Sequence, residues 1–267
     1  MIRKTLQATK AATFSIDLPN SQQQGMPTPT GTGFFVSPDG WFVTAAHVIM
    51  DRGTNAPRGD LDKAWLMQPP FSGHVFVTMY QHVTLDHVDL KNDFALLKVD
   101  FAANTSKESL EGQTGFPFIE VSLRPLEEGE PVYAFGYPLP LSRLVVNDPT
   151  MTAGVSQYSP RVTSAIVSST LERSLPATTG AETRVYVLDK ALNYGNSGGP
   201  IIAMETGRVH ALCSRFQPAT IPQPQLSRDP NKPIYIVVPS LYGIVSSLSN
   251  PEVVEALTKR SIPISDK

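Results

Sequence analysis

Gly195-Asn196-Ser197-Gly198-Gly199-Pro200 is the stretch that decides the fold, because it sets one serine among three glycines. Two earlier segments belong with it, Thr44-Ala45-Ala46-His47-Val48 and Asp93-Phe94-Ala95-Leu96-Leu97. A histidine, an aspartate and a glycine-flanked serine therefore follow one another along the chain, each beside an apolar, strand-like run. A serine hydroxyl is nearly inert at neutral pH and needs an adjacent base, so this set is typical of nucleophilic acyl transfer.

Length and composition exclude several classes of protein. The 267 residues suit one large all-β domain or two small ones that share a core, and a hydrophobic content of 41% argues against disorder. A formal net charge of −2 gives no reason to expect a nucleic-acid partner. No apolar stretch is long enough to span a membrane, so no membrane partner is expected either.

The single cysteine, Cys213, excludes disulfides within the chain and suits a reducing compartment. It lies in the apolar run 209–213, where we expect a buried, inert thiol. The first residues are basic but lack the apolar core of a secretory signal, so a cytoplasmic location is expected. Nothing in the sequence calls for a cofactor.

Short runs rich in β-branched and aromatic residues dominate the chain and are separated by turn signals, a pattern that predicts a barrel or a sandwich. The predicted strands are 34–36, 41–44, 74–80, 94–99, 132–135, 162–167, 184–188, 209–213 and 234–238. Long polar loops are expected at 51–71, 138–160 and 214–233, the last because its five prolines argue against a central strand.

Helical spacing is found only near the end of the chain. Pro239-Ser240 predicts the start of one helix with an apolar face that ends at Leu248, and Asn250-Pro251 predicts the start of a second. Gly and Pro residues between 110 and 130 predict a crossing between two barrels. The expected domains are an N-terminal arm with the first strand (1–30), an N-terminal barrel (31–115), a C-terminal barrel (116–240) and a helical tail (241–267).

Each chemistry-bearing residue has a proposed role. Ser197 is the candidate nucleophile and His47 the general base, because a free imidazole titrates near neutral pH. Asp93 would orient His47 and stabilise its cation. The oxyanion hole is assigned to Gly195, Asn196 and Ser197, with the N–H groups of Gly195 and Ser197 as donors.

Structural alternatives exist for each of these residues. The serine loop has a simple tight turn as its alternative, the histidine the satisfied end of a strand, and the aspartate a turn residue that starts a strand. Asp86 and Asp89 are rivals to Asp93, but neither leads directly into a comparable apolar strand. His82, Asp86, His87 and Asp89 lack a helical metal-binding spacing, so a solvated strand face is favoured over a metal site.

The motifs together resemble the trypsin-like serine proteases, specifically the HtrA-type branch. The resemblance covers most of the chain and includes three further segments besides the three above: 31–40, 134–138 and 188–197. It implies two six-stranded antiparallel β-barrels of chymotrypsin type packed face to face, with a short C-terminal helical segment. It also implies a serine endopeptidase that acts on polypeptides, and a homo-oligomer or a regulatory partner protein.

The resemblance also suggests which residues bind substrate. The primary pocket would be formed by Ala191, Leu192 and Asn193, with Ala191 at its base, and Ser214-Arg215-Phe216 would pair with the substrate backbone as an added strand. An uncharged base predicts cleavage after small or medium apolar residues. The chain departs from the family in leaving only about twenty-five residues after the second barrel, so no PDZ domain is expected.

Two other functions remain open at this point. A catalytically silent peptide-binding scaffold of the same fold would need none of the residues His47, Asp93, Ser197 and Gly195. An esterase is suggested by the pattern Gly-x-Ser-x-Gly at 195–199, but the missing alternation of strands and helices argues against that fold.

Overall fold

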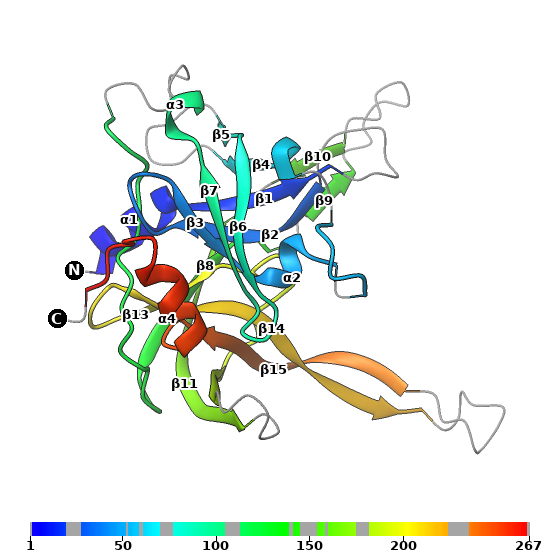
Figure 1. Ribbon diagram of the computed structural model, residues 1–267. Coiled ribbons are helices and arrows are strands. Elements are labelled where there is room, and N and C mark those ends of the chain that lie inside the picture. The colour runs from blue at the N-terminus through cyan, green and yellow to red at the C-terminus, as the bar shows by residue number, and fades with distance from the viewer. Residues whose placement is uncertain are drawn as a thin grey trace.

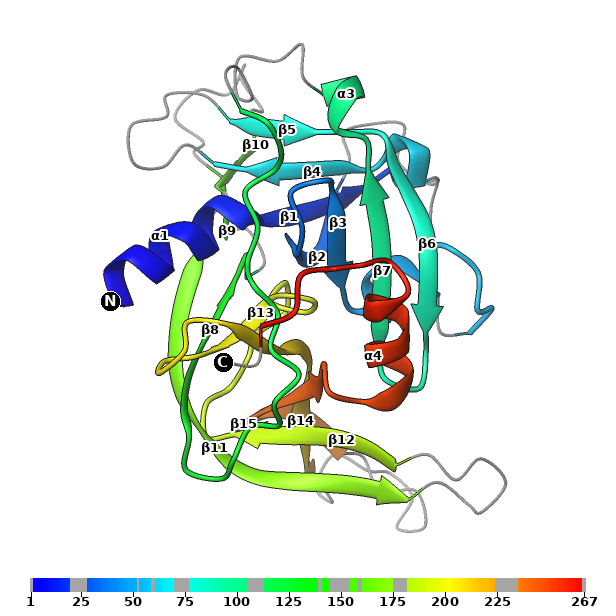
Figure 2. The ribbon, with the colours of Figure 1, turned by 60° about the vertical axis from the view of Figure 1, so that its left-hand side comes forward.

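The computed structural model describes residues 2–19, 28–51, 53–58, 61–69, 77–104, 113–138, 141–144, 154–157, 160–174, 182–223 and 235–265. Strands make up most of this part of the chain and form two β units that lie against each other (Figures 1 and 2). The predicted all-β class is therefore confirmed.

The N-terminal unit is a sheet of seven antiparallel strands in the order β5-β4-β1-β2-β3-β7-β6. Its strands are β1 (Thr13–Leu18), β2 (Thr28–Phe35), β3 (Trp41–Thr44), β4 (Trp65–Gln68), β5 (Thr78–Tyr80), β6 (Val83–Asp89) and β7 (Phe94–Val99). A cluster of aromatic rings fills its interior, including Phe35 stacked on Phe116 with ring centroids 4.3 Å apart. The expected six-stranded barrel is not observed in this unit. Within the described residues the seven strands form an open sheet whose edge strands are β5 and β6.

The C-terminal unit is a closed barrel of six strands in the order β11-β12-β15-β14-β13-β8, as predicted. Its strands are β8 (Pro131–Gly136), β11 (Arg161–Ser174), β12 (Glu182–Leu188), β13 (Pro200–Ala203), β14 (Val209–Pro222) and β15 (Tyr235–Ser247). Two short strands, β9 (Leu141–Leu144) and β10 (Gly154–Gln157), pair only with each other. The far ends of β14 and β15 extend beyond the barrel as a two-stranded arm (Figure 1).

The helices are short. They are α1 (Ile2–Ala12), α2 (Ala46–Ile49), the 3₁₀ turn η1 (Leu61–Lys63), α3 (Phe101–Asn104) and α4 (Pro251–Thr258). Helix α4 begins where Asn250-Pro251 predicted it, and its buried residues Val253 and Leu257 join the core of the N-terminal sheet. Helix α1 was not predicted. No helix in the described chain combines the length and apolar character needed to cross a membrane.

Two predictions near the end of the chain are wrong. Residues 241–247, predicted as helix, complete β15, and β14 runs to Pro222 through part of the predicted loop 214–233. The two strands pair along their length, with Pro218 opposite Pro239. In an antiparallel ladder, the two residues of every second facing pair exchange no N–H···O bonds. Proline, which has no N–H group, can occupy such a pair without losing a bond between the strands.

The other predicted loops also contain strands. Strand β4 lies within the predicted loop 51–71, and β9 and β10 lie within 138–160. The remainder of these segments is only partly within the described residues.

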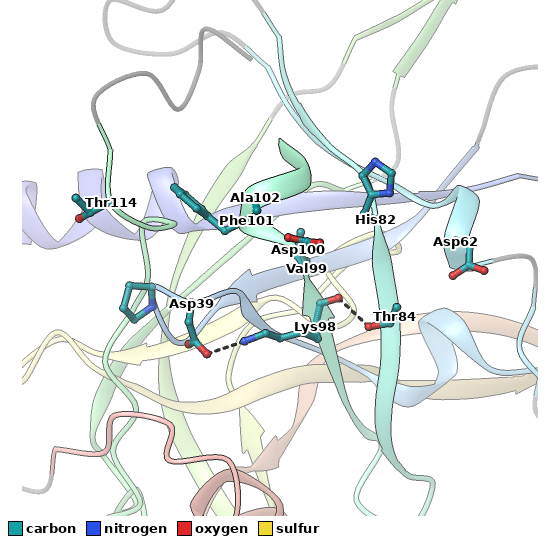
Figure 3. A pocket seen from close by; sticks show the side chains of 11 residues that line it. Asp39, Asp62, His82, Thr84, Lys98, Val99, Asp100, Phe101, Ala102 and Thr114 are labelled. Carbon is teal, nitrogen blue, oxygen red and sulfur yellow. Dashed lines mark hydrogen bonds and ion pairs between the residues drawn. The ribbon is translucent and has the colours of Figure 1, made fainter. Parts of the chain in front are cut away.

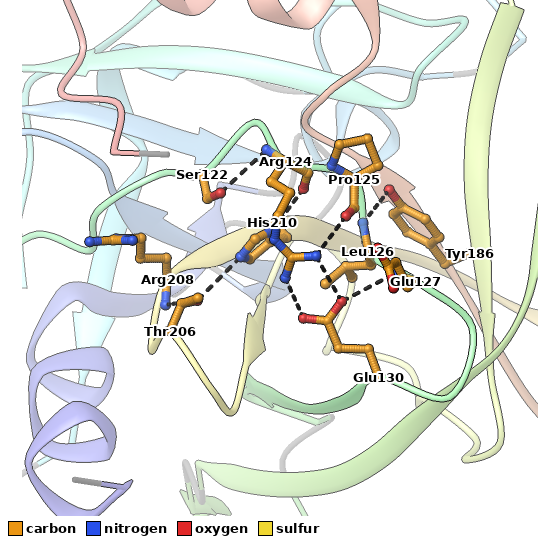
Figure 4. A network of polar contacts seen from close by, with 10 residues as sticks. All are labelled: Ser122, Arg124, Pro125, Leu126, Glu127, Glu130, Tyr186, Thr206, Arg208 and His210. Carbon is orange, nitrogen blue, oxygen red and sulfur yellow. Dashed lines mark hydrogen bonds and ion pairs between the residues drawn. The ribbon is translucent and has the colours of Figure 1, made fainter. Parts of the chain in front are cut away.

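The crossing segment joins the two units through successive hydrogen bonds. Ile119 donates its N–H to Phe35 of the N-terminal sheet, and Ser122 donates to Val209 of the barrel. Further along, the Arg124 guanidinium binds both carboxylate oxygens of Glu130 at 3.2 and 2.5 Å (Figure 4). The first two bonds connect the crossing segment to both units, whereas the Arg124–Glu130 pair lies within the segment that leads into β8.

Candidate active site

Neighbouring strands bring His47 and Asp93 together. Strands β3 and β7 are antiparallel, with Thr44 at the end of β3 opposite Ala95 at the start of β7. His47 follows β3 in α2, and Asp93 immediately precedes β7. Two residues 46 positions apart therefore meet at the same end of these two neighbouring strands.

The carboxylate of Asp93 holds the ring and the backbone of His47. Nδ1 of His47 lies 3.0 Å from Oδ1 and 2.8 Å from Oδ2 of Asp93, and the His47 N–H donates to Oδ1 at 3.0 Å. The hydroxyl of Ser214 donates to Oδ2 at 2.5 Å. Because a carboxylate only accepts, these contacts assign the ring proton to Nδ1 and leave Nε2 with a lone pair.

Asp93 is buried yet charged. Burial by itself would raise the pKa of this carboxyl, but the hydrogen bond and charge of His47, together with the Ser214 hydroxyl, outweigh it and lower the pKa. The carboxylate therefore stays ionised at neutral pH. Its backbone is left-handed, with φ 52°, a conformation in which Asp is several-fold enriched among non-glycine residues.

Ser197 lies on a tight turn between β12 and β13. Gly198 has φ +83°, and a Cβ there would come within 2.2 Å of the Thr32 carbonyl oxygen, so only glycine fits. The Ser197 hydroxyl donates to the Ser214 carbonyl at 3.4 Å, a long contact. Within the described chain no hydrogen bond joins this hydroxyl to His47, although Ser214 contacts both Ser197 and Asp93.

The turn before Ser197 leaves two N–H groups available. Asn196 donates its N–H to the Asn193 carbonyl at 3.1 Å, which closes a turn whose third residue, Gly195, has φ 91°. A type II turn requires positive φ at that position and therefore favours glycine. The N–H groups of Gly195 and Ser197 have no acceptor among the described residues, whereas that of Asn196 is already engaged.

The predicted substrate-binding residues surround this turn. Ala191 is partly exposed, Leu192 is buried and Asn193 is exposed. A Cβ at Gly243 of β15 would lie 2.7 Å from Cγ of Leu192, so this glycine lets the two segments pack closely. Ser214 is buried and Arg215 half-buried in β14; Phe216 is also in β14, but its side chain lies outside the described part of the structure.

A cavity of 300 Å³ opens beside the site. Its lining comes from the N-terminal sheet through Asn92 and Asp93, and from the barrel through residues that include Ser214 and Arg215. A larger cavity, of 740 Å³, lies elsewhere at the end of β7, beside His82 and Phe101 (Figure 3). The smaller cavity is lined by Asp93 but by neither His47 nor Ser197, and the larger cavity is lined by none of the three.

The rival acidic residues have other partners. Asp86 pairs with Arg260, and Asp89 accepts hydrogen bonds from the N–H groups of Lys91 and Asn92. Among the described residues no group of three or more His, Cys, Asp or Glu side chains is arranged to hold a metal ion. Cys213 is buried, and burial together with the charge of Asp93 raises the pKa of its thiol.

Residues 31–212 match the model of the trypsin-like peptidase domain. The chain belongs to this family. It is 27% identical over 181 residues to the human "Serine protease HTRA4", covering 67% of the chain and 29% of that protein. It is 29% identical over 185 residues to the "Putative serine protease HhoB" of Synechocystis, covering 69% of the chain and 33% of that protein. The chain thus spans about a third of the length of these curated relatives.

Solved structures share the fold of this trypsin-like peptidase domain. The Rv3671c protease of M. tuberculosis, in its active form, superposes with a TM-score of 0.57 at 19% identity, covering 98% of this chain and 85% of that one. The HtrA-type protease AlgW with a tripeptide gives a TM-score of 0.58 at 16% identity, covering 98% of this chain and 65% of that one. The resemblance to HtrA-type proteases found in the sequence is therefore confirmed.

Two residues of this trypsin-like domain have contacts at the site that sequence reasoning did not assign. Ser214 was predicted to meet substrate through its backbone, and its hydroxyl also binds Asp93. Thr32 was not singled out, yet it contacts the Ser197 turn. The flanking glycines of Gly31-Thr32-Gly33 were the available signal, because they allow close approach of another segment.

Proposed function

We propose that this chain is a serine endopeptidase that hydrolyses peptide bonds through Ser197, His47 and Asp93. The observation that carries the proposal is the pairing of Nδ1 of His47 with both oxygens of Asp93, beside a serine on a glycine turn. This pairing leaves the lone pair of His47 on Nε2, which can then act as the base for Ser197.

The reaction follows from these positions. Ser197 Oγ attacks the peptide carbonyl while its proton passes to Nε2 of His47, and Asp93 stabilises the resulting imidazolium. The carbonyl oxygen becomes an oxyanion that the N–H groups of Gly195 and Ser197 bind. His47 then protonates the departing amine, and water hydrolyses the acyl-enzyme by the same steps with its own proton passing first to His47.

The serine hydroxyl must turn before it can react. Its contact with the Ser214 carbonyl is 3.4 Å long and therefore weak, so rotation about the Cα–Cβ bond toward His47 costs little. Catalytic hydrogen bonds are often long or misaligned before substrate binds and tighten in the complex.

We further propose that the residue before the cleaved bond is small or medium-sized and apolar. Ala191, Leu192 and Gly243 contribute no charge, and the close packing of Leu192 against Gly243 limits the depth available to a side chain. The edge of β14 at Ser214 and Arg215 would pair with the substrate backbone.

Labelling with a fluorophosphonate probe tests the proposal directly. We expect the wild-type chain to be labelled, and Ser197→Ala and His47→Ala to lose labelling while keeping the wild-type circular dichroism spectrum. Folded wild-type protein that is not labelled would favour the silent scaffold instead.

Cleavage-site profiling on a peptide mixture tests specificity. We expect cuts after small or medium apolar residues, and cuts mainly after Lys or Arg would refute the proposed pocket. Hydrolysis of esters without any peptide cleavage would point to an esterase.

A further inference from the structure

Thr32 of β2 makes four hydrogen bonds where the two units meet. Its N–H donates to the Ser197 carbonyl at 2.8 Å, and its hydroxyl donates to the Gly195 carbonyl at 2.6 Å. The same hydroxyl accepts the N–H of Tyr137 at 3.0 Å, and its carbonyl accepts the hydroxyl of Thr44 at 2.7 Å. The side chain is fully buried.

These bonds restrain the peptide between Gly195 and Asn196 on both sides. Thr32 holds its carbonyl oxygen, and the Asn193 carbonyl accepts its N–H at 3.1 Å. The N–H of Gly195 belongs to the preceding peptide, which joins Tyr194 to Gly195, and its direction is set by the torsions on either side of that peptide, one of which is the φ of 91° at Gly195. Holding the Gly195–Asn196 peptide therefore anchors one end of the peptide that carries this N–H. If the Thr32 hydroxyl is removed, the Gly195 carbonyl loses this hydrogen-bond donor, which is unfavourable for a buried polar group.

The hydroxyl is itself oriented from the barrel. Tyr137 follows β8, and besides donating its N–H to Thr32 it donates its own hydroxyl to the Thr13 carbonyl of β1 at 3.0 Å. Because Tyr137 N–H occupies a lone pair of the Thr32 oxygen, the Thr32 proton is directed toward Gly195. The geometry of the turn thus depends on contacts from both units.

We propose that Thr32 is a positioning residue that holds the Gly195 N–H in place for the oxyanion, an inference that rests on the proposed function. It acts through the Gly195–Asn196 peptide and does not touch the substrate. The hydroxyl, and not merely the size of the side chain, carries this role.

Thr32→Val tests the proposal because it removes the hydroxyl and keeps the shape. We expect kcat to fall about ten- to hundredfold while KM changes less than about twofold, since misplacing an oxyanion donor weakens transition-state binding more than substrate binding. Thr32→Ser restores the hydroxyl and should recover most of kcat. Thr30→Val is the matched control, because Thr30 lies in the same strand and donates its hydroxyl to the Ile16 carbonyl within the sheet.

The amide resonance of Gly195, measured in the Ser197→Ala background, gives a readout that does not need turnover. We expect it to shift in Thr32→Val and to stay unchanged in Thr30→Val. Unchanged kcat in Thr32→Val, or an equal loss in Thr30→Val, would overturn the inference. A wild-type chain without turnover would refute the proposed function, and the Gly195 resonance would still decide the role of Thr32.

Discussion

At the scale of single residues, the site depends on one buried charge with three donors. Asp93 accepts hydrogen bonds from the ring and N–H of His47 and from the Ser214 hydroxyl. A carboxylate at the head of an apolar strand is costly unless it is partnered, and this is what distinguished Asp93 from its rivals in the sequence. The hydroxyls of Ser214 and Thr32 had no such signal, because serine and threonine are common in strands and turns without any role in a site.

Asp93→Asn should abolish most activity without unfolding the chain. The amide has nearly the same shape, but its NH₂ group competes as a donor, and the ring can then present its protonated nitrogen to Ser197. We expect kcat/KM at pH 7.5 to fall about 10³- to 10⁴-fold. Steady-state kinetics alongside thermal unfolding checks this, and a loss below tenfold in a folded variant would show that Asp93 does not orient the base.

At the scale of elements, β14 connects the parts of the site. It carries Cys213, whose carbonyl accepts the Gly198 N–H at 2.6 Å, and then Ser214. Its start at 209–213 was predictable from the apolar run Val209-His210-Ala211-Leu212-Cys213, but its continuation to Pro222 was not. The start of β15 was predicted at 234–238, but its continuation to Ser247 was not. The apolar residues at 241, 244, 245 and 248 fit helical spacing, and pairing with β12 and β14 overrides that local pattern.

His210, four residues before Ser214 in β14, should make stability depend on pH. Nδ1 of this buried ring lies 2.8 Å from the Arg124 carbonyl, and Nε2 lies 3.3 Å from the Thr206 hydroxyl (Figure 4). Burial lowers the pKa of His210, so below about pH 6.5, the value of a free imidazole, the unfolded chain binds more protons than the folded one. The free energy of unfolding therefore decreases as the pH falls through this range.

His210→Asn removes that titration. Urea unfolding at pH 8 measures how much the substitution lowers the free energy of unfolding through lost packing alone. Between pH 7 and pH 5, the free energy of unfolding should decrease less in the variant than in the wild type. Parallel curves for the two proteins over this range would mean that His210 does not contribute to the pH dependence.

At the scale of the whole molecule, the site lies between two units that share part of their hydrophobic core. The cluster around the N-terminal sheet also includes Tyr133, Ile202 and Val209 of the barrel, and Leu257 of α4. The closed barrel and the position of α4 followed from the sequence. The seven-stranded arrangement did not, because short strands such as β4, which lies in a predicted loop, depend on pairing across the sheet and not on their own four residues.

Sharing a core predicts that the two units unfold together, and Leu188→Ala tests this from the barrel side. Leu188 is fully buried in the separate cluster inside the barrel, and truncating it should lower the free energy of unfolding by about 2–5 kcal/mol. The only tryptophans, Trp41 and Trp65, lie in the N-terminal sheet, so their fluorescence reports the other unit. If unfolding is cooperative, the midpoints from fluorescence and from circular dichroism shift together. A fluorescence midpoint that stays at its wild-type value while the circular dichroism midpoint falls would show two independent units, and a site between them could then be lost before either unit unfolds completely.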